Sequence, residues 1–263
     1  MNTMTDINDP TLVKLLSVDL FFDIDVYTKI EPFTLRQMAI DYGLYEDEVL
    51  CRVTAFNKLG KATRGKVSSK TAVNKINKLF SEDILRTAIF LEDEKYECDN
   101  QDTMTIYTSA YNNSGFKSYI SFLISDVSKI SEIETFFRDL CEKYSPMYGS
   151  AALYILDHFP RVIEGLSKIQ ELNLTHPIHS LNINRYEGSL SKGIVNDFHW
   201  LNYFSNKYFS KLQLSSLRNE EVIDNSEEGK LIQLSKGPFL TEEELERITL
   251  LRSENTEYLD IFR

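Results

Sequence analysis

Cysteine, glycine and proline are scarce in this chain, which has 263 residues but only 3 Cys, 10 Gly and 6 Pro. The cysteines, Cys51, Cys98 and Cys141, lie far apart. An odd count without short spacing argues against both a disulfide framework and a zinc site. We therefore expect reduced thiols and a cytoplasmic protein. The scarcity of glycine and proline also argues against long flexible linkers.

Also missing are a targeting segment, a long apolar run and an excess of positive charge. The opening residues, MNTMTDINDP, lack the basic start and apolar run of a signal peptide, and no uninterrupted apolar stretch approaches the roughly 20 residues of a membrane span. The chain has 29 basic and 40 acidic residues, a formal net charge of −11. Such a surface repels nucleic acid and anionic membranes and attracts basic proteins. We expect neither nucleic acid nor membrane as a partner, although the charge also serves solubility.

Apolar and aromatic residues are plentiful, at 42% and 12% of the chain, which is enough for a substantial core. We expect a single domain over residues 1–263, with residues 1–17 as a poorly ordered N-terminal arm. Apolar patterns typical of strands cover residues 18–28, Arg86–Leu91, 103–111, 117–125, 149–156 and 230–234, and residues 194–204 mix strand and turn character. Short connections containing Asp, Asn and Gly between residues 86 and 125 favour antiparallel pairing.

Helical periodicity with start and stop signals predicts helices over residues 34–59, 70–80, 131–144, 160–172 and 206–212, and a last helix from residue 241. Ser131 with Glu134, and Thr241 with Glu244, have the spacing of capping boxes. Residues 64–69, 173–184 and 219–229 are predicted loops. Because strands and helices occur without regular βαβ spacing, we predict an α+β fold with a largely antiparallel sheet flanked by helices.

One motif approaches a cofactor-binding signature. Residues 60–67, GKATRGKV, nearly match the phosphate-binding loop G-x-x-x-x-G-K-[ST]. The last position needs a hydroxyl that binds magnesium, and Val67 has none. The motif belongs to a basic tract, from Lys58 to Lys78, that a solvated surface explains as well. A P-loop-like nucleotide-binding protein is therefore an alternative interpretation.

Other chemistry-bearing residues do not form a recognisable set. His176 and His179 are two potential zinc ligands where three or four are needed. Ser189 and Lys192 match S-x-x-K, but the companion motifs of β-lactamases are absent. The sequence accordingly predicts no enzyme activity, no cofactor and no metal.

Acidic residues cluster in three segments of the chain. One contains Glu92, Asp93 and Glu94, the second contains Glu220, Glu221, Asp224, Glu227 and Glu228, and the third contains Glu242, Glu243, Glu244 and Glu246. The third lies at a predicted helix N-terminus, where the macrodipole stabilises carboxylates. The first two lie in loop-like regions, where both solvation and contact with a partner account for them. We take the first two as the candidate partner-binding residues.

The one tryptophan, Trp200, lies in the aromatic segment 198–204, FHWLNYF. A lone tryptophan among other aromatics predicts a core anchor with a hydrogen-bonded indole N–H, and an interface anchor is the alternative.

Several segments together resemble the type VI immunity family. Residues 193–204, GIVNDFHWLNYF, are similar to the W-L-[NT] segment of that family, and residues 118–124 (SYISFLI) and 147–152 (MYGSAA) are similar to its middle, where a strand enters a helix and then a glycine-centred buried strand. Residues 231–238, LIQLSKGP, resemble its penultimate strand and turn, and the region of Tyr258 fits its last helix. Residues 213–216, QLSS, depart from the paired glycines that the family often has after its short helix.

The resemblance implies a non-enzymatic antidote, kept in the cytoplasm of a bacterium that deploys a toxin between cells. We therefore expect an immunity protein that binds a cognate antibacterial toxin, such as a nuclease, and blocks it by steric and electrostatic occlusion. The resemblance transfers no catalytic residue. A scaffolding protein without a toxin partner is a third interpretation, and the sequence makes no prediction about self-association.

Overall fold

Strands dominate the architecture. The computed structural model describes residues 13–24, 30–45, 52–56, 62–66, 74, 86–91, 102–108, 118–156, 178–179 and 197–259. Its strands are β1 (Val13–Phe22), β2 (Arg52–Phe56), β3 (Ala62–Lys66), β4 (Arg86–Leu91), β5 (Thr103–Thr108), β6 (Ser118–Ile124), β7 (Tyr148–Leu156), β8 (Ile178–His179), β9 (Leu201–Ser205), β10 (Val222–Asn225) and β11 (Gly229–Gln233). The described helices are α1 (Pro32–Asp41), α3 (Ile130–Tyr144), α6 (Asn206–Phe209) and α7 (Glu242–Glu254), with a 3-10 turn η2 (Asn219–Glu221).

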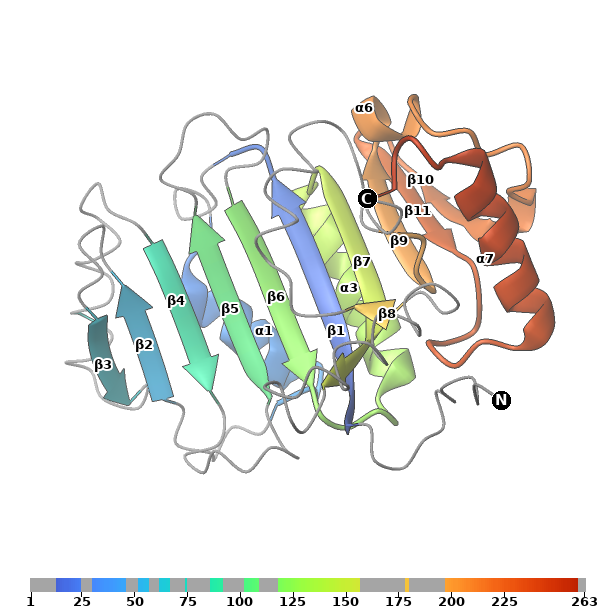
Figure 1. The fold of residues 1–263 in the computed structure, drawn as a ribbon. Coiled ribbons are helices and arrows are strands. Elements are labelled where there is room, and N and C mark those ends of the chain that lie inside the picture. Colours follow the sequence, from blue (N-terminus) through green and yellow to red (C-terminus); the bar gives the residue numbers. More distant parts are fainter. Residues whose placement is uncertain are drawn as a thin grey trace.

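The eleven described strands form one sheet in the order β10-β11-β9-β7-β1-β6-β5-β4-β2-β3, with β8 paired to β7 beside this path (Figure 1). Neighbouring strands are antiparallel except for the parallel pair of β7 and β8. β1 lies in the middle, where Leu20 is opposite Ile120 of β6 and Gly149 of β7. The predicted α+β fold with a largely antiparallel sheet is confirmed.

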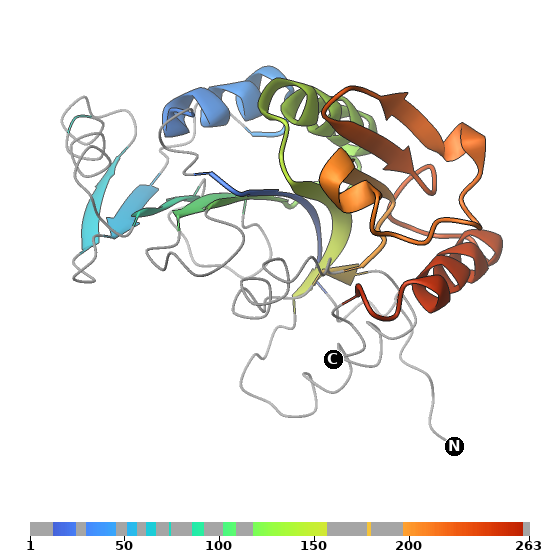
Figure 2. The same cartoon turned by 90° about the horizontal axis from the view of Figure 1, so that it is seen from above.

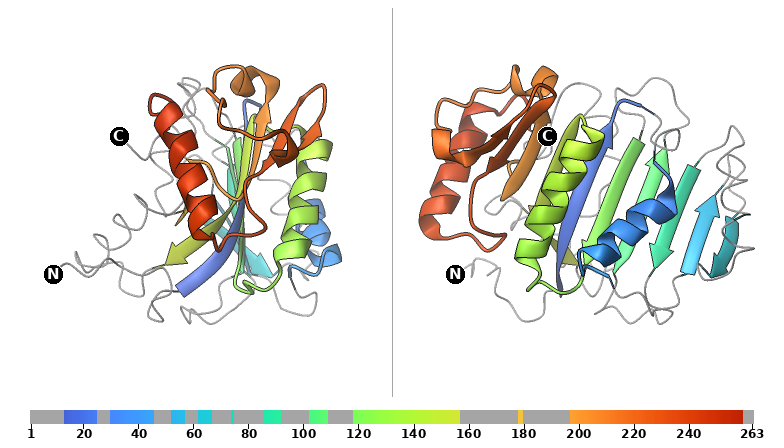
Figure 3. Two further views of the ribbon diagram at one scale, coloured as in Figure 1. Left: turned by 90° about the vertical axis from the view of Figure 1, so that its right-hand side faces the viewer. Right: turned by 180° about the vertical axis from the view of Figure 1, so that it is seen from behind.

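Helices α1 and α3 cover one face of the sheet (Figures 2 and 3). Alternate residues of β1, among them Leu16 and Leu20, are buried in the same apolar cluster as Phe136 and Phe137 of α3. Gly149 allows this close approach, because a Cβ at that position would lie 2.9 Å from Leu20 Cδ2 and 3.2 Å from the Phe137 ring. The packing of α3 therefore depends on bare backbone in β7.

The opposite face of the central strands packs against the C-terminal part of the chain, where α7 lies on the other side of the sheet from α3 (Figure 3). A second buried cluster joins Phe21 of β1 to Tyr148 of β7, Phe204 of β9, and Ile248 and Leu251 of α7. The ring centroids of Phe21 and Tyr148 are 5.6 Å apart, and those of Tyr148 and Phe204 are 5.4 Å apart. Both faces of β1 are thus buried, which explains its nearly continuous apolar sequence.

Most of the predicted elements are confirmed with shifted ends. The three consecutive strands predicted between residues 86 and 125 are β4, β5 and β6, and they pair antiparallel. α3 has its predicted apolar stripe and ends before Pro146, with Ser145 in the left-handed region at φ 44°. β7, β9, α6, β11 and α7 also occupy predicted segments, and Thr241 and Glu244 form the predicted capping box.

Several local predictions are wrong. The helix predicted over 34–59 ends at Asp41, and Gly43 follows in the left-handed region at φ 69°. Residues 52–56 are strand β2, because pairing with both β3 and β4 outweighs their helical spacing. Residues 64–66 belong to β3 and residues 222–225 to β10, so neither predicted loop is a simple loop. Ser131 forms no capping box, since α3 begins one residue earlier and Ser131 Oγ donates to Glu132.

The predicted N-terminal arm is also too long, because β1 begins at Val13 and includes residues 13–17. Other predictions concern residues outside the described ranges: residues 1–12 of the arm, the helix over 160–172, and, apart from residue 74, the helix over 70–80. Of the predicted loop 173–184, residues 178–179 form β8.

Candidate functional site

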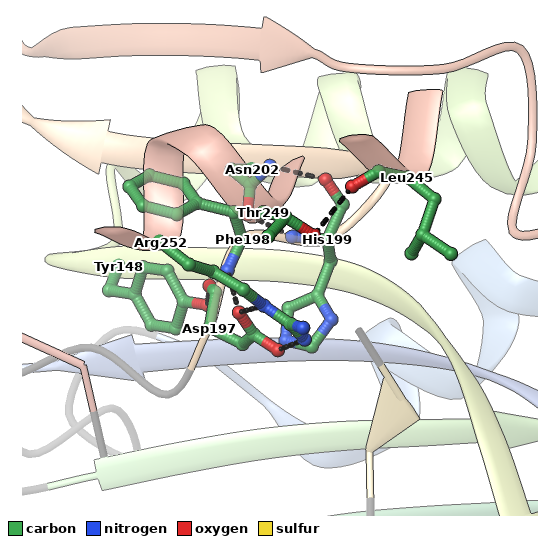
Figure 4. A network of polar contacts seen from close by, with 8 residues as sticks. All are labelled: Tyr148, Asp197, Phe198, His199, Asn202, Leu245, Thr249 and Arg252. Carbon is green, nitrogen blue, oxygen red and sulfur yellow. Dashed lines mark hydrogen bonds and ion pairs between the residues drawn. The ribbon is translucent and has the colours of Figure 1, made fainter. Parts of the chain in front are cut away.

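A buried ion pair joins the segment that leads into β9 to α7. The side chains of Asp197 and Arg252 are 2% and 3% exposed. Arg252 Nε donates to Asp197 Oδ1 at 2.8 Å, and Arg252 Nη2 pairs with Oδ2 (Figure 4). The Phe198 N–H also donates to Oδ1, at 2.8 Å, and the Tyr148 hydroxyl donates to the Asp197 carbonyl at 3.2 Å. Charges withdrawn from water need such additional hydrogen bonds, so we call Asp197, Arg252 and these partners the α7 clamp.

The residues after Asp197 form a turn that Asn202 closes. The His199 N–H donates to Asn202 Oδ1 at 2.9 Å, and Asn202 Nδ2 donates to the His199 carbonyl at 2.7 Å. Trp200 is 2% exposed, which confirms the predicted core anchor. Its predicted indole hydrogen bond is absent, however, because Nε1 has no acceptor among the described residues. The aromatic segment therefore serves the core and is not a surface site.

A second group of polar contacts fixes residues 213–216 at the C-terminal end of α7. Asn255 is fully buried; its Oδ1 accepts from the Gln213 N–H at 2.7 Å and its Nδ2 donates to the Gln213 carbonyl at 2.6 Å. Glu254 accepts from the hydroxyls of Ser215 at 2.6 Å and Ser216 at 2.8 Å. Burial raises the pKa of Glu254 and these hydrogen bonds lower it, with a net decrease. The QLSS segment thus has a defined conformation without paired glycines.

From this base the chain forms an acidic hairpin, which we define as η2, β10, the 226–228 turn and β11, residues 219–233. Glu221 is buried, pairs with Arg247 of α7 and accepts from the Arg218 N–H at 2.7 Å. On the other arm, a Cβ at Gly229 would lie 2.5 Å from the Tyr203 hydroxyl. The acidic hairpin is therefore fixed to α7 on one side and packed directly against β9 on the other.

Four carboxylates of the acidic hairpin point into solvent. Glu220, Asp224, Glu227 and Glu228 are exposed. Within the described residues none of these carboxylates makes a hydrogen bond or an ion pair. Over residues 197–259 the sequence has seven basic and twelve acidic residues, a net formal charge of −5. This part of the molecule consequently presents a negative surface to an approaching partner.

The charge of the acidic hairpin also affects the titration of a buried tyrosine, Tyr203. Burial raises the pKa of Tyr203 to about 12, and electrostatic contributions from Cys141 and from the carboxylates of Glu228 and Asp224 add to the increase. Tyr203 lies opposite Leu231 in the pairing of β9 with β11, and its hydroxyl lies beside Gly229, next to the turn of the acidic hairpin. The neutral phenol is the stable form there, so it can take part only in hydrogen bonding at neutral pH.

An apolar side chain stands among these acids. Ile223 is 37% exposed and lies in β10 at a register shift, where Val222 pairs with Ile232 and Asp224 with Leu231. A bulge of this kind leaves one residue without a partner on the neighbouring strand. An apolar anchor surrounded by charge is the arrangement found at protein interfaces.

The structure divides the predicted contact residues into three groups. Glu92, Asp93 and Glu94 lie outside the described residues. Glu220, Asp224, Glu227 and Glu228 come together on the acidic hairpin. Glu221 is buried in its ion pair with Arg247, so its carboxylate has a structural role in the hairpin. Sequence reasoning missed Ile223, because the four-residue strand VIDN is too short to show which side chain faces outward.

The near P-loop motif lies mostly in a strand. Residues 62–66 form β3, which pairs antiparallel with β2. A phosphate-binding loop needs successive backbone N–H groups turned toward the phosphate at the start of a helix, whereas an extended strand directs them alternately to its two sides. The structure gives no support to nucleotide binding at this motif.

The described residues offer neither a metal site nor a membrane-spanning helix. No group of three or more His, Cys, Asp or Glu in the described ranges is arranged to hold a metal ion. None of the described helices is long and apolar enough to cross a membrane.

The fold matches that of a solved bacterial protein. The structure of Pseudomonas aeruginosa T6SS protein PA0821 superimposes with a TM-score of 0.68, covering 95% of this chain and 74% of that chain, at 13% sequence identity. No family model matches the sequence, and no curated protein matches it either. At this identity the likeness shows a shared fold.

Proposed function

We propose that this chain is an immunity protein that binds a cognate antibacterial toxin and blocks it by steric and electrostatic occlusion. The observation that carries the proposal is the acidic hairpin, which presents four exposed carboxylates together with the exposed Ile223, and these carboxylates make no hydrogen bond or ion pair within the described residues. The resemblance of residues 118–152, 193–204 and 231–238 to the type VI immunity family supports the same function. So does the fold shared with a P. aeruginosa T6SS protein.

An antidote to a lethal enzyme has to bind tightly. Nanomolar to picomolar dissociation constants correspond to about −12 to −16 kcal/mol, and interfaces of that kind combine a few anchors with complementary charge. The acidic hairpin offers both, with Ile223 as the anchor and the neighbouring carboxylates as the charge. An enzyme that acts on nucleic acid binds phosphate with basic side chains, so a nuclease toxin would present a cleft that this surface complements.

The rigidity of the acidic hairpin favours such binding. Its position is set by the Glu221–Arg247 ion pair and by the contact of Gly229 with Tyr203. A surface that is already ordered loses little conformational entropy on association. The buried contacts of the acidic hairpin thus hold its exposed carboxylates in position for binding.

The test is a rescue experiment. The toxin candidate, the domain encoded by the gene adjacent to this one, is expressed in a sensitive bacterium with and without this chain. We expect growth arrest without it, growth with it, and co-purification of the two proteins as a stable complex. If the toxin arrests growth, this chain does not relieve the arrest and the two proteins form no complex, the proposal is contradicted for that pairing.

A variant with lysine at Glu220, Asp224, Glu227 and Glu228 tests the surface itself. It should lose protection while keeping the circular dichroism spectrum and thermal midpoint of the natural protein, because these side chains are exposed. Full protection by this variant would move the contact away from the acidic hairpin without affecting the immunity proposal.

A further inference from the structure

We propose that the toxin docks on the edge of β10 and adds a basic extended segment to the sheet as one more strand. This inference rests on the proposed function and specifies how the two proteins meet. Its basis is the strand order, in which β10 is the terminal strand and pairs on one side with β11 (Figure 1).

The outer side of β10 is accessible. Ile223, Asp224 and Asn225 are all exposed, and no described strand pairs with the outer side of β10. An edge strand presents a row of backbone N–H and C=O groups that another chain can use. Strand addition takes its affinity from these main-chain hydrogen bonds and its specificity from the flanking side chains.

The charges on this edge select the incoming strand. β10 has the features that discourage indiscriminate pairing, since it is 4 residues long, contains Asp224 and has a bulge at Ile223. Like charges directly opposite one another destabilise a pair of strands, whereas opposite charges stabilise it. A strand carrying Lys or Arg is therefore favoured over the equally acidic β10 edge of a second copy.

The competing occupant is the other end of this chain's own sheet. Terminal strand β3 has the sequence ATRGK, with Arg64 and Lys66, so a second copy could bring β3 to β10. Pairing of this type is head-to-tail and assembles open chains of molecules unless the rotation closes a ring. It would also bring together molecules that each have a net charge of −11. For this reason we assign the β10 edge to the toxin.

Amide exchange followed residue by residue by NMR distinguishes strand addition from side-chain contact. The sample is the full chain alone and in complex with the toxin domain from which it rescues growth. We expect exchange of outward-facing amides within residues 222–225 to slow by about tenfold or more on binding, since new backbone hydrogen bonds protect them. The amides of β5 and β6, which are paired in the free protein, are the internal control.

The outcomes separate the two proposals. A chain that rescues nothing and forms no complex contradicts the proposed function. A chain that rescues growth and forms the complex, but shows unchanged exchange over residues 222–225, overturns strand addition alone.

A charge-reversal pair gives a second test. Asp224→Lys/Glu227→Lys reverses one charge on β10 and one in the adjoining turn, and Glu132→Lys/Glu142→Lys makes the same change in charge at exposed positions of α3. At low salt we expect the first variant to slow association with the toxin domain by about tenfold and the second to change it much less. Equal effects of the two variants would overturn the placement of the toxin on this edge.

Light scattering on the free protein tests the competing occupant. We expect a monomer at all concentrations used for binding. Assembly that grows with concentration and disappears in Asp224→Lys/Glu227→Lys would show that a second copy occupies the β10 edge, and would overturn the proposal.

Discussion

Replacing Arg252 by methionine is predicted to destabilise the fold strongly. Met preserves an unbranched apolar stem but removes the guanidinium that binds Asp197 through Nε and Nη2. The carboxylate of Asp197 then stays buried, at 2% side-chain exposure, without that cation. Removing one partner of a buried ion pair costs about 3–5 kcal/mol, because water cannot reach the charge left behind.

That loss is large compared with the stability of an ordinary domain, which is about 5–15 kcal/mol. The damage should begin at α7, since Arg252 lies on its inner face beside Leu251 and Ile248. The acidic hairpin depends on α7 through the Glu221–Arg247 pair. Under the proposed function, we therefore expect the variant to lose toxin binding at temperatures where the sheet around β1 is still folded.

Urea denaturation followed by circular dichroism measures the free energy of unfolding. The matched control is Arg138→Met, which removes another arginine–carboxylate pair from a helix. Arg138 and Glu134 are 3.1 Å apart on α3, with side chains 45% and 29% exposed. Exposed i,i+4 pairs contribute about 0.3–0.5 kcal/mol, so the control should unfold almost like the natural protein. The m-values should be similar for all three proteins.

Two results would refute this reasoning. A loss below about 1 kcal/mol for Arg252→Met would be the value of a solvated surface pair and would mean that the clamp is hydrated. A loss that shrinks markedly when salt is added would mean the same, because buried pairs are screened far less than exposed ones. Adding Asp197→Asn should recover part of the loss, since it removes the uncompensated charge.

Three further predictions test other parts of the structure. Gly229→Ala should cost about 1–3 kcal/mol by overpacking against the Tyr203 hydroxyl, 2.5 Å from the new Cβ, whereas Gly237→Ala, with its nearest neighbour at 3.4 Å, should not; equal thermal midpoints would contradict this. Thr241→Ala should cost about 1 kcal/mol in urea unfolding because Thr241 caps α7, while Ser131→Ala, at a cap that does not form, should cost less than about 0.5 kcal/mol. The pKa of Tyr203 is raised from 10.0 to about 12, so its stabilising contribution is complete below pH 10 and is lost as the pH rises toward 12. Tyr203→Phe should therefore lose less stability than the natural protein between pH 10 and pH 12. An identical loss in the two proteins would refute the shift.

The sequence predicts this fold well where local pattern and tertiary pairing agree. β4, β5 and β6 have strand patterns, short connections and antiparallel partners. The prediction for residues 52–56 is wrong because Val53 and Phe56 have helical spacing, and only the pairing of β2 with β3 and β4 makes this segment a strand. The capping box predicted at Ser131 is wrong because a capping box depends on which residue begins the helix, and α3 begins at Ile130.

Of the candidate site, too, only part could be predicted from the sequence. Composition alone reveals the acidic cluster between Glu220 and Glu228. It does not reveal that Glu221 is buried, since its partner Arg247 is far along the chain. Nor does it reveal that β10 is a terminal strand, because this follows from the order of all the strands in the sheet.

Of the segment 193–204 that resembles the type VI immunity family, the described residues 197–204 belong to the interior. Phe198, Trp200, Leu201 and Asn202 are all buried, and Asp197 belongs to the α7 clamp. Similarity in this segment therefore reflects the packing of β9 and the attachment of α7, which are requirements of the fold. The four exposed carboxylates of the acidic hairpin, Glu220, Asp224, Glu227 and Glu228, make no such contacts within the described residues, so they can change with little effect on the core. Under the proposed immunity function, a protein built in this way can be adapted to a new toxin by substitutions on the acidic hairpin, while the α7 clamp, and with it the fold, stays the same.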